Sequence, residues 1–440
     1  MQDFPYMGYA MGNIGQFRDA QKLKEAGFDY VRTSHYAQAP SFLNACDELG
    51  IMVMDSIPGL GYFNSNTTFR NRSYQDMRDI IRRDRNHPCV ITWELSLNES
   101  GFDQAYATNA VSIGHNEYPG SFISGWLFDA TYDIFIATPS AGARTYSGNK
   151  PLIISEYGHW EYGGNGCPSD VHRGNIGDSY YFGEAAMINQ VTNHQNGYNL
   201  NLGMTNMCGD GLWVGIDYAQ YPSGVLDVFR IPKFSYYFFK SQRDANNLIP
   251  GIDTGPMVYI ANFWTASSPT TVKVFSNCDQ VSLYRNNVFV ATRNHDTDSN
   301  STNLPHPPFT FTGVTFASGT LRADGVIDGN VVATHTVRTP GSAAALSLAF
   351  DVNDVPADSS EIITVNASIV DSSGTLVPTA SSTNVTFTVT GQAALACPAT
   401  IKSEAGIATC YIRMYDQPGL ITVNATASGL TSGSASITSQ

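Results

Sequence analysis

The sequence has few charged side chains and no long apolar run. Charged residues make up 14% of the 440 residues, whereas hydrophobic residues reach 42% and aromatic residues 12%. Disordered chains are rich in charge and poor in aromatic residues, so this composition excludes a largely disordered protein. No apolar stretch approaches the length of about 18 residues that a membrane-spanning helix requires, so no membrane span is expected.

Basic residues are outnumbered by acidic ones. The 24 Lys and Arg residues compare with 38 Asp and Glu residues, which gives a net charge of −14. Because a cleft in so acidic a chain repels phosphate groups, nucleic acid is not expected as a partner.

The seven cysteines are scattered and include no Cys-X-X-Cys pair, so a zinc site has no support in the sequence. Cys397 and Cys410 lie in a strand-rich stretch with a turn between them, which leaves a disulfide and two free thiols both open. The first six residues have neither the basic nor the apolar region of a signal peptide. Localisation therefore stays open, although seven Asn-X-Ser/Thr sequons favour a secreted or periplasmic protein.

Residues 1–244 alternate between helical and strand patterns. Apolar residues recur at helical spacing around residues 14–23, 42–49 and 77–81. Short apolar runs that end in polar residues follow, at residues 30–35, 51–54 and 90–95. Alternating strands and helices predict a parallel sheet, and polar residues after each strand are typical of a (β/α)₈ barrel, the TIM barrel.

From about residue 245 a period of two replaces the helical pattern. Alternating apolar residues occur at 272–274, 281–283, 288–290, 363–369 and 421–425, separated by turn residues such as Asn286-Asn287. This pattern predicts two immunoglobulin-like β-sandwiches with a join near Thr339-Pro340-Gly341. The expected domains are a barrel at 1–244 and all-β sandwiches at 245–340 and 341–440.

Two of the expected strands end in a glutamate. Asn98 and Glu99 follow the strand at 90–95, and Glu156 ends the apolar run 152–155. Two carboxyl groups on one rim of a barrel suit glycoside hydrolysis, in which one is the acid/base and the other the nucleophile. A glutamate at a strand end also serves as a salt-bridge or capping partner, so the pattern alone leaves both interpretations open.

Five motifs together resemble the catalytic barrel of glycoside hydrolase family 2, the family of β-galactosidases, β-glucuronidases and β-mannosidases. They occur in the family's order and span most of residues 1–244. The motifs are Arg32-Thr33-Ser34-His35-Tyr36, Cys46-Asp47-Glu48-Leu49-Gly50-Ile51, Arg85-Asn86-His87-Pro88, Leu97-Asn98-Glu99-Ser100 and Pro151-Leu152-Ile153-Ile154-Ser155-Glu156-Tyr157-Gly158.

The resemblance implies a retaining exo-β-glycosidase that acts on a carbohydrate, with β-D-galactosides as the lead substrate. Glu99 would be the acid/base and Glu156 the nucleophile that forms a covalent glycosyl–enzyme intermediate. Asn98 would hold the sugar 2-hydroxyl, and His35 would contact the sugar. Tyr157, Trp213 and His159 are candidate pocket residues, although packing at the rim explains Trp213 and His159 equally well. Arg32 is expected beneath the pocket, tied to carboxylates.

The sequence departs from the family's pattern at three places. The Glu and His that help bind magnesium in many β-galactosidases are replaced in Asp55-Ser56-Ile57-Pro58-Gly59, so neither a metal nor a cofactor is expected. The Asn-X-Lys by which β-glucuronidases hold a carboxylate is missing, which disfavours a uronic acid. Glu94 stands where the family usually has Ser, and its charge is expected to raise the pKa of Glu99.

The resemblance also stops short at the beginning of the sequence. Two domains that precede the family's barrel have no counterpart, and Gln2-Asp3-Phe4 matches the stretch after the first barrel strand. An absent strand leaves an unpaired sheet edge, so a homo-oligomer or a missing N-terminal portion is expected to complete the barrel. Three functions stay open: the glycosidase, a non-catalytic carbohydrate-binding or structural protein, and the catalytic half of a multi-chain glycosidase.

Overall fold

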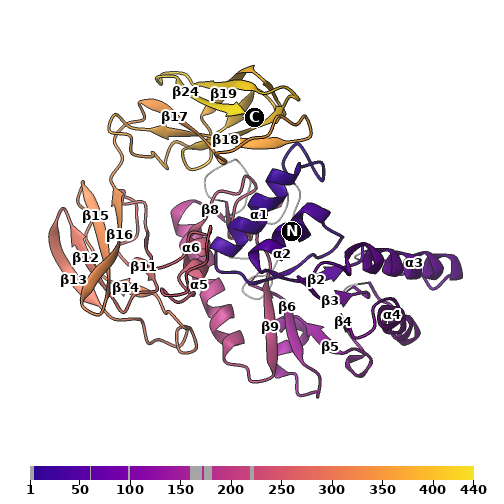
Figure 1. Ribbon diagram of the computed structural model, residues 1–440. Coiled ribbons are helices and arrows are strands. Elements are labelled where there is room, and N and C mark those ends of the chain that lie inside the picture. The colour runs from indigo at the N-terminus through magenta and orange to yellow at the C-terminus, as the bar shows by residue number, and fades with distance from the viewer. Residues whose placement is uncertain (1–3, 60, 98–99, 159–170, 173–180, 219–221) are drawn as a thin grey trace. The chain divides into compact units, whose positions relative to one another are not determined.

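The computed structural model describes residues 4–59, 61–97, 100–158, 171–172, 181–218 and 222–440 (Figure 1). The chain forms two compact units. The first comprises residues 16–167 and 196–215, and the second comprises residues 2–15, 168–195 and 216–440. The expected domain boundaries at residues 244 and 340 stay predictions.

The first unit is built around a parallel sheet in the order β1-β2-β3-β4-β5-β6-β9. Cα atoms of the two edge strands, β1 and β9, approach within 8 Å, although no ladder joins these two strands. The sheet is therefore a nearly closed barrel of seven strands among the described residues, and the prediction of a TIM barrel is confirmed. The strands are β1 (Tyr30–Arg32), β2 (Met52–Ser56), β3 (Val90–Glu94), β4 (Phe122–Gly125), β5 (Ile134–Ala137), β6 (Leu152–Tyr157) and β9 (Met207–Leu212).

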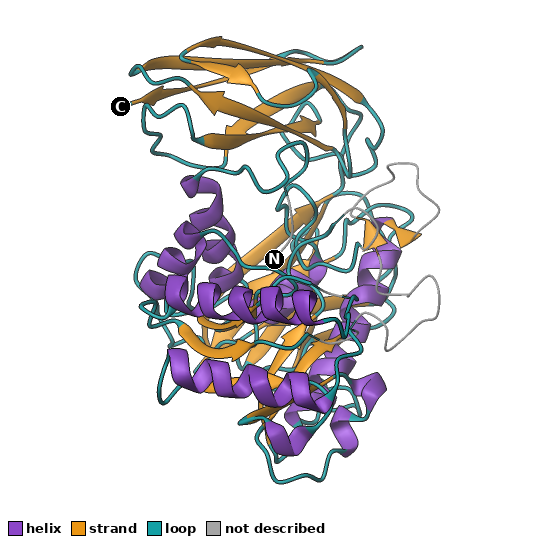
Figure 2. Ribbon diagram, turned by 90° about the vertical axis from the view of Figure 1, so that its right-hand side faces the viewer, coloured by secondary structure: helices purple, strands orange, loops and turns teal. Residues whose placement is uncertain are grey.

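Helices cover the outside of the barrel strands (Figure 2). Local sequence explains where the helices begin and end: Pro40 occupies the first turn of α2, and Gly50 ends it in the left-handed conformation at φ 65°. Asn66 and Asp103 cap α3 and α4 by accepting backbone N–H bonds. The helices are α1 (Asn13–Glu25), α2 (Pro40–Leu49), α3 (Thr67–Asp84), α4 (Gln104–Glu117), α5 (Gly183–Leu202) and α6 (Phe234–Lys240), with 3₁₀ turns η1 (Asp129–Thr131), η2 (Pro139–Ala141) and η3 (Ala143–Thr145).

Two packed layers position the barrel strands. Outside, α2 packs Phe42, Leu43 and Cys46 against the β-sheet, and all three side chains are fully buried. Inside, Met54, Ile136 and Ile153 form an apolar cluster. Apolar burial of this kind contributes about 25 cal/mol per Å² and is the main force that holds the strands in register. The sheet pairs Arg32 with Met54 and Ser56 with Glu94.

The C-terminal part of the second unit forms two antiparallel sandwiches, as expected. The first pairs sheets β10-β11-β14 and β13-β12-β15-β16, and the second pairs sheets β17-β18-β22-β20 and β21-β19-β23-β24. Asn286 and Asn287 form the hairpin turn at φ 51° and 62°, as their sequence predicts. The strands of the first sandwich are β10 (Val258–Ala261), β11 (Val272–Ser276), β12 (Gln280–Arg285), β13 (Val288–Arg293), β14 (Phe309–Phe311), β15 (Thr320–Ile327) and β16 (Asn330–Arg338). Those of the second are β17 (Ala345–Phe350), β18 (Ile362–Val370), β19 (Asn384–Gly391), β20 (Ala393–Leu395), β21 (Thr400–Lys402), β22 (Ile407–Met414), β23 (Gly419–Thr426) and β24 (Gly433–Ser439), and a separate pair consists of β7 (Val171–His172) and β8 (Tyr181–Phe182).

Two features of the sandwiches answer questions that the sequence left open. Cys397 and Cys410 are both free thiols. The apolar alternation at Val288 and Val290 does not mark a core face, because both side chains are exposed on the edge strand β13. Among the described residues, no helix combines the length and the apolar character needed to cross a membrane.

Candidate active site

Arg32 links two glutamates at the carboxyl end of the barrel strands. Its Nε and Nη2 donate to the two carboxylate oxygens of Glu94, both at 2.6 Å, and its Nη1 donates to Glu156 Oε1 at 2.6 Å. Arg32 and Glu94 are buried, and the side chain of Glu156 is 11% exposed. The expectation that Arg32 is buried and tied to carboxylates matches this geometry.

Glu156 is held in its ionised form. Burial alone raises the pKa of a carboxyl group, but the neighbouring imidazole of His35 and the positive charge of Arg32 outweigh burial and lower the pKa of Glu156 to about 2. The Nε2 atom of His35 lies 3.6 Å from Glu156 Oε1. A buried carboxylate that stays charged at neutral pH is suited to act as a nucleophile.

Two further predicted residues, Trp213 and Tyr157, are linked to this part of the first unit. The rings of His35 and Trp213 are tilted at 43° with centroids 5.5 Å apart. The backbone N–H of Trp213 donates to the carbonyl oxygen of Tyr157 at 2.9 Å, which ties the end of β9 to the end of β6. Tyr157 is buried, whereas His35 and Trp213 are half-buried. The structure thus brings together five of the predicted site residues, Arg32, His35, Glu156, Tyr157 and Trp213.

The remaining predicted site residues, Asn98, Glu99 and His159, lie outside the described residues. The acid/base role of Glu99 and its separation from Glu156 therefore stay predictions. The expected effect of Glu94 on the pKa of Glu99 stays a prediction for the same reason.

The sequence did not identify two residues, one that contacts Glu94 and one that packs inside the barrel. Ser56, at the end of β2, donates its hydroxyl to Glu94 Oε2 at 2.8 Å. Trp126, directly after β4, packs against the apolar cluster inside the barrel, and its Nε1 is buried without a hydrogen-bond partner among the described residues. The position of Trp126 after a strand end is the signal that could have identified it.

A cavity of about 330 Å³ lies beside the segments that follow β2 and β3. Its lining includes Leu97 and Ser100, which flank the predicted Asn98-Glu99 pair. Its lining also includes five aromatic side chains, which come from both segments and from the first turns of α3 and α4. They are Tyr62, Phe63, Phe69, Phe102 and Tyr106.

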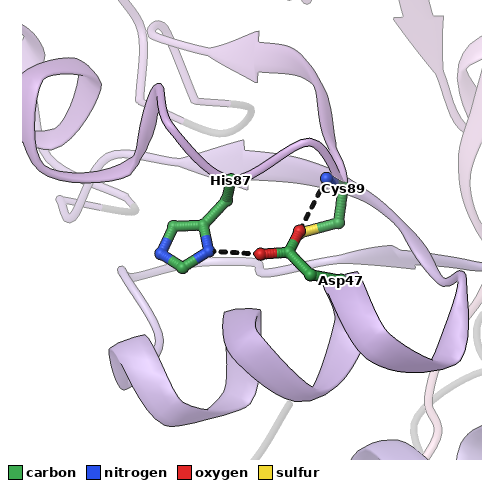
Figure 3. A group of neighbouring side chains, drawn as sticks. All are labelled: Asp47, His87 and Cys89. Carbon is green, nitrogen blue, oxygen red and sulfur yellow. Dashed lines mark hydrogen bonds and ion pairs between the residues drawn. The ribbon is translucent and has the colours of Figure 1, made fainter.

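Asp47, His87 and Cys89 gather before the start of β3 (Figure 3), whereas Glu156 lies near the carboxyl end of β6. Asp47 bonds His87 Nδ1 at 2.6 Å and accepts the backbone N–H of Cys89 at 2.8 Å. Burial raises the pKa of the Cys89 thiol, which disfavours the thiolate that a metal ion needs. We interpret the group as a structural link between α2 and the start of β3.

Glu117 forms an ion pair between two helices. It ends α4, where Arg82 Nε and Nη2 donate to its two carboxylate oxygens at 2.8 and 2.7 Å. This pairing connects α3 with α4 on the outside of the barrel.

Family models match three stretches of the chain. The model described as "Glycosyl hydrolases family 2, TIM barrel domain" matches residues 2–115, and "Glycoside hydrolase family 2 C-terminal domain 5" matches residues 346–436. Residues 267–333 match a domain of unknown function.

Similar proteins carry the names of β-glycosidases. A β-galactosidase of Thermoanaerobacter pseudethanolicus is 32% identical over 461 residues, which cover 96% of this chain and 58% of that protein. A structure of a β-glucuronidase from glycoside hydrolase family 2 has a TM-score of 0.78 at 21% identity and covers 100% of this chain and 47% of its own. A β-glycosidase structure from Bacteroides vulgatus has a TM-score of 0.77 at 21% identity, and the match covers 98% of this chain and 62% of that one.

The chain spans about half the length of the curated relatives that it matches. At 21% identity, the two solved structures establish the fold alone. The barrel model covers four of the five sequence motifs, and the second model lies in the last sandwich. The chain belongs to glycoside hydrolase family 2.

Proposed function

We propose that the chain is a retaining exo-β-glycosidase that hydrolyses terminal β-linked sugars, with β-D-galactosides as the lead substrate. The observation that carries the proposal is the buried Glu156 carboxylate at the end of β6, held ionised by Arg32 and His35. A nucleophile must be negatively charged when it attacks the anomeric carbon, and these contacts keep it so at neutral pH.

The mechanism is a double displacement. Glu156 attacks the anomeric carbon while Glu99 protonates the leaving oxygen, which gives a covalent glycosyl–enzyme intermediate and releases the aglycone. Glu99 then takes a proton from water, and the resulting hydroxide displaces Glu156 with a second inversion. Asn98 holds the sugar 2-hydroxyl, a hydrogen bond that strengthens as the ring becomes oxocarbenium-like. The proposal includes no metal or cofactor.

Aromatic side chains provide the walls of the sugar site. In the proposal, Trp213 and Tyr157 border the sugar ring, because an indole offers an apolar face to sugar C–H groups. His35 contacts the sugar next to Glu156. His159, three residues after Glu156 in the sequence, is proposed as a further sugar contact. The aromatic cavity beside Leu97 and Ser100 is proposed to receive the leaving group.

Galactose is preferred over a uronic acid on three grounds. The relative with 32% identity is named a β-galactosidase. The chain lacks the Asn-X-Lys that holds a substrate carboxylate in β-glucuronidases, and its net charge is −14.

The direct experiment measures hydrolysis of a panel of nitrophenyl β-glycosides by the chain, by Glu156→Gln and by Glu48→Gln. Glu48 is an exposed residue of α2 and serves as a matched control. We expect the highest rate on the β-galactoside, a loss of at least about 1,000-fold in kcat for Glu156→Gln, and wild-type rates for Glu48→Gln. Turnover by Glu156→Gln at the wild-type rate would overturn the nucleophile assignment.

The same experiment separates the two alternative functions. Sugar binding without turnover on any glycoside would favour a non-catalytic carbohydrate-binding protein. Turnover that appears only after a second polypeptide is added would favour the catalytic part of a multi-chain glycosidase. Light scattering tests the expected homo-oligomer, because it reports whether the particle mass is a multiple of 47.7 kDa.

A further inference from the structure

Glu94 is the least expected member of the site. It ends β3 and is fully buried, five positions before Glu99 in the sequence. Both of its carboxylate oxygens are engaged, Oε1 by Arg32 Nη2 and Oε2 by Arg32 Nε and the Ser56 hydroxyl. Burying a carboxylate costs free energy because the group loses its hydration. A buried carboxylate therefore needs a paired cation and hydrogen bonds, and Arg32 and Ser56 provide them for Glu94.

The contact between Glu94 and Arg32 determines where the arginine points. A guanidinium is planar, and two parallel N–H bonds to one carboxylate fix its plane as well as its position. The Nη1 atom, which lies outside that pair of bonds, donates to Glu156 at 2.6 Å. The direction of this third hydrogen bond is therefore set by Glu94.

Glu94 also changes the net charge around the nucleophile. Arg32 alone would neutralise Glu156, whereas two ionised glutamates and one arginine sum to one negative charge. An excess negative charge suits a reaction in which positive charge develops on the sugar ring. With Glu94 neutral, the guanidinium would interact more strongly with Glu156 and make that carboxylate a poorer nucleophile.

We infer that Glu94 is a positioning residue for the nucleophile: it orients Arg32 through a two-point contact, and Arg32 in turn holds Glu156 in place. This inference rests on the proposed glycosidase function. Because Glu94 acts through Arg32 and does not bind the sugar, its removal is expected to change kcat and leave substrate affinity nearly intact.

Glu117 provides a matched control for this role. It accepts the same two-point contact, from Arg82 Nε and Nη2, but on the outside of the barrel between α3 and α4. Glu117→Gln thus removes the same chemistry from a part of the unit that has no role in the site. Glu94→Asp keeps the negative charge and shortens the side chain by one methylene. This variant therefore distinguishes the effect of the charge from the effect of side-chain length.

The test compares Glu94→Gln, Glu94→Asp and Glu117→Gln on a nitrophenyl β-galactoside, with active sites counted by burst titration. For Glu94→Gln we expect kcat to fall by about 10- to 100-fold, with KM within about 3-fold of the wild-type value, since a misplaced catalytic group costs roughly that much. Glu94→Asp should recover part of kcat, and Glu117→Gln should match the wild type.

A second measurement does not depend on turnover. In wild-type protein labelled with ¹⁵N-arginine, Arg32 should give a downfield Hε signal and separate Hη signals, because its guanidinium cannot rotate. Glu94→Gln should shift or broaden these signals, and Glu117→Gln should leave them in place. The Arg32 signals are assigned from Arg32→Lys.

The outcomes distinguish the inference from the function on which it rests. If Glu156→Gln loses activity while Glu94→Gln keeps the wild-type kcat per active site, the positioning role is overturned and the glycosidase stands. Unchanged Arg32 signals in Glu94→Gln would also overturn it. If Glu94→Gln does not fold, the kcat of Glu94→Asp is measured in its place. A wild-type kcat for Glu94→Asp would contradict the claim that the length of the Glu94 side chain positions Arg32. Activity that persists in Glu156→Gln overturns the proposed function itself.

Discussion

At the residue scale, the site is governed by competition between burial and charge at Glu156. Burial alone raises the pKa of this carboxyl group, yet the contacts with His35 and Arg32 lower it to about 2. A group whose pKa is depressed in the folded state stabilises the protein above its unfolded pKa, and that stability is lost as the pH falls toward 2. Glu156 is therefore fully ionised across the physiological range.

His35 is predicted to keep the nucleophile ionised in acid. Replacing it by Asn removes the imidazole beside Glu156, so burial is less opposed and the pKa of Glu156 rises. In a pH profile of kcat/KM on a nitrophenyl β-galactoside, the acid limb of His35→Asn should lie at higher pH than that of the wild type. An acid limb that superimposes on the wild-type curve would contradict this role of His35.

The sequence specified much of this site and left part of it open. A strand-end glutamate and the family motifs pointed to Glu156, Arg32 and His35, because the carboxyl ends of parallel strands meet on one rim. The pairing of Arg32 with Glu94 did not follow from the motifs, since it depends on the register that places β1, β2 and β3 side by side. Glu94 stood out only as a departure from the family's Ser.

At the scale of elements, α2 and β3 are linked by one aspartate. Asp47 bonds His87 and the backbone N–H of Cys89 (Figure 3). Local patterns do not show such a link, because its partners lie about 40 residues apart in the chain.

Loss of this link should destabilise the barrel. Asp47→Ala leaves the backbone N–H of Cys89 without its acceptor, and we expect the free energy of unfolding to fall by about 1–3 kcal/mol in urea titration at pH 7. The neighbouring exposed Glu48→Ala is the control and should change it by less than about 0.5 kcal/mol. Equal losses in the two variants would show that the contacts of Asp47 carry no special weight.

The first sandwich contains a histidine that responds to acid. His335 of β16 accepts the backbone N–H of Ile260 through Nδ1 at 3.0 Å, and burial lowers its pKa to about 4. Between pH 6.5 and 4 the unfolded chain binds a proton that the folded chain does not, so stability falls with falling pH. Urea titrations at pH 7 and pH 4.5 should show a loss of about 2 kcal/mol from this group.

The matched variant is His335→Gln, which cannot take up that proton. Between pH 7 and pH 4.5, the free energy of unfolding of the variant should fall less than that of the wild type. The difference between the two falls should be about 2 kcal/mol, the contribution of His335. Parallel pH dependence in wild type and variant would mean that His335 does not titrate differently on unfolding.

At the scale of the whole molecule, composition and periodicity predicted the architecture well. A helical period followed by a period of two separated the barrel from the sandwiches, and the turn chemistry of Asn286-Asn287 was correct. The exposed face of β13 was not predicted, because an apolar alternation on an edge strand looks the same in sequence as one that faces a core. The degree to which the seven described strands close into a barrel was also not predicted, because closure depends on the three-dimensional curvature of the sheet.

Net charge leads to a prediction about substrate choice. With 38 acidic and 24 basic residues, the chain should repel an anionic sugar at long range. We expect kcat/KM for a nitrophenyl β-galactoside to exceed that for the β-glucuronide by at least about 10-fold at low salt. Raising the salt concentration to about 0.2 M should increase the glucuronide value and leave the galactoside value unchanged, since salt screens charge interactions. A faster reaction on the glucuronide at low salt would contradict the account.

The central claim is that Glu156 is the nucleophile of a retaining β-galactosidase. The most direct measurement is to treat the chain with 2,4-dinitrophenyl 2-deoxy-2-fluoro-β-D-galactoside, which accumulates the covalent intermediate, and to locate the label by peptide mass spectrometry. The account predicts one fluorogalactosyl group per chain, attached to Glu156. A label on another residue, or steady hydrolysis of β-galactosides with no label on Glu156, would contradict it.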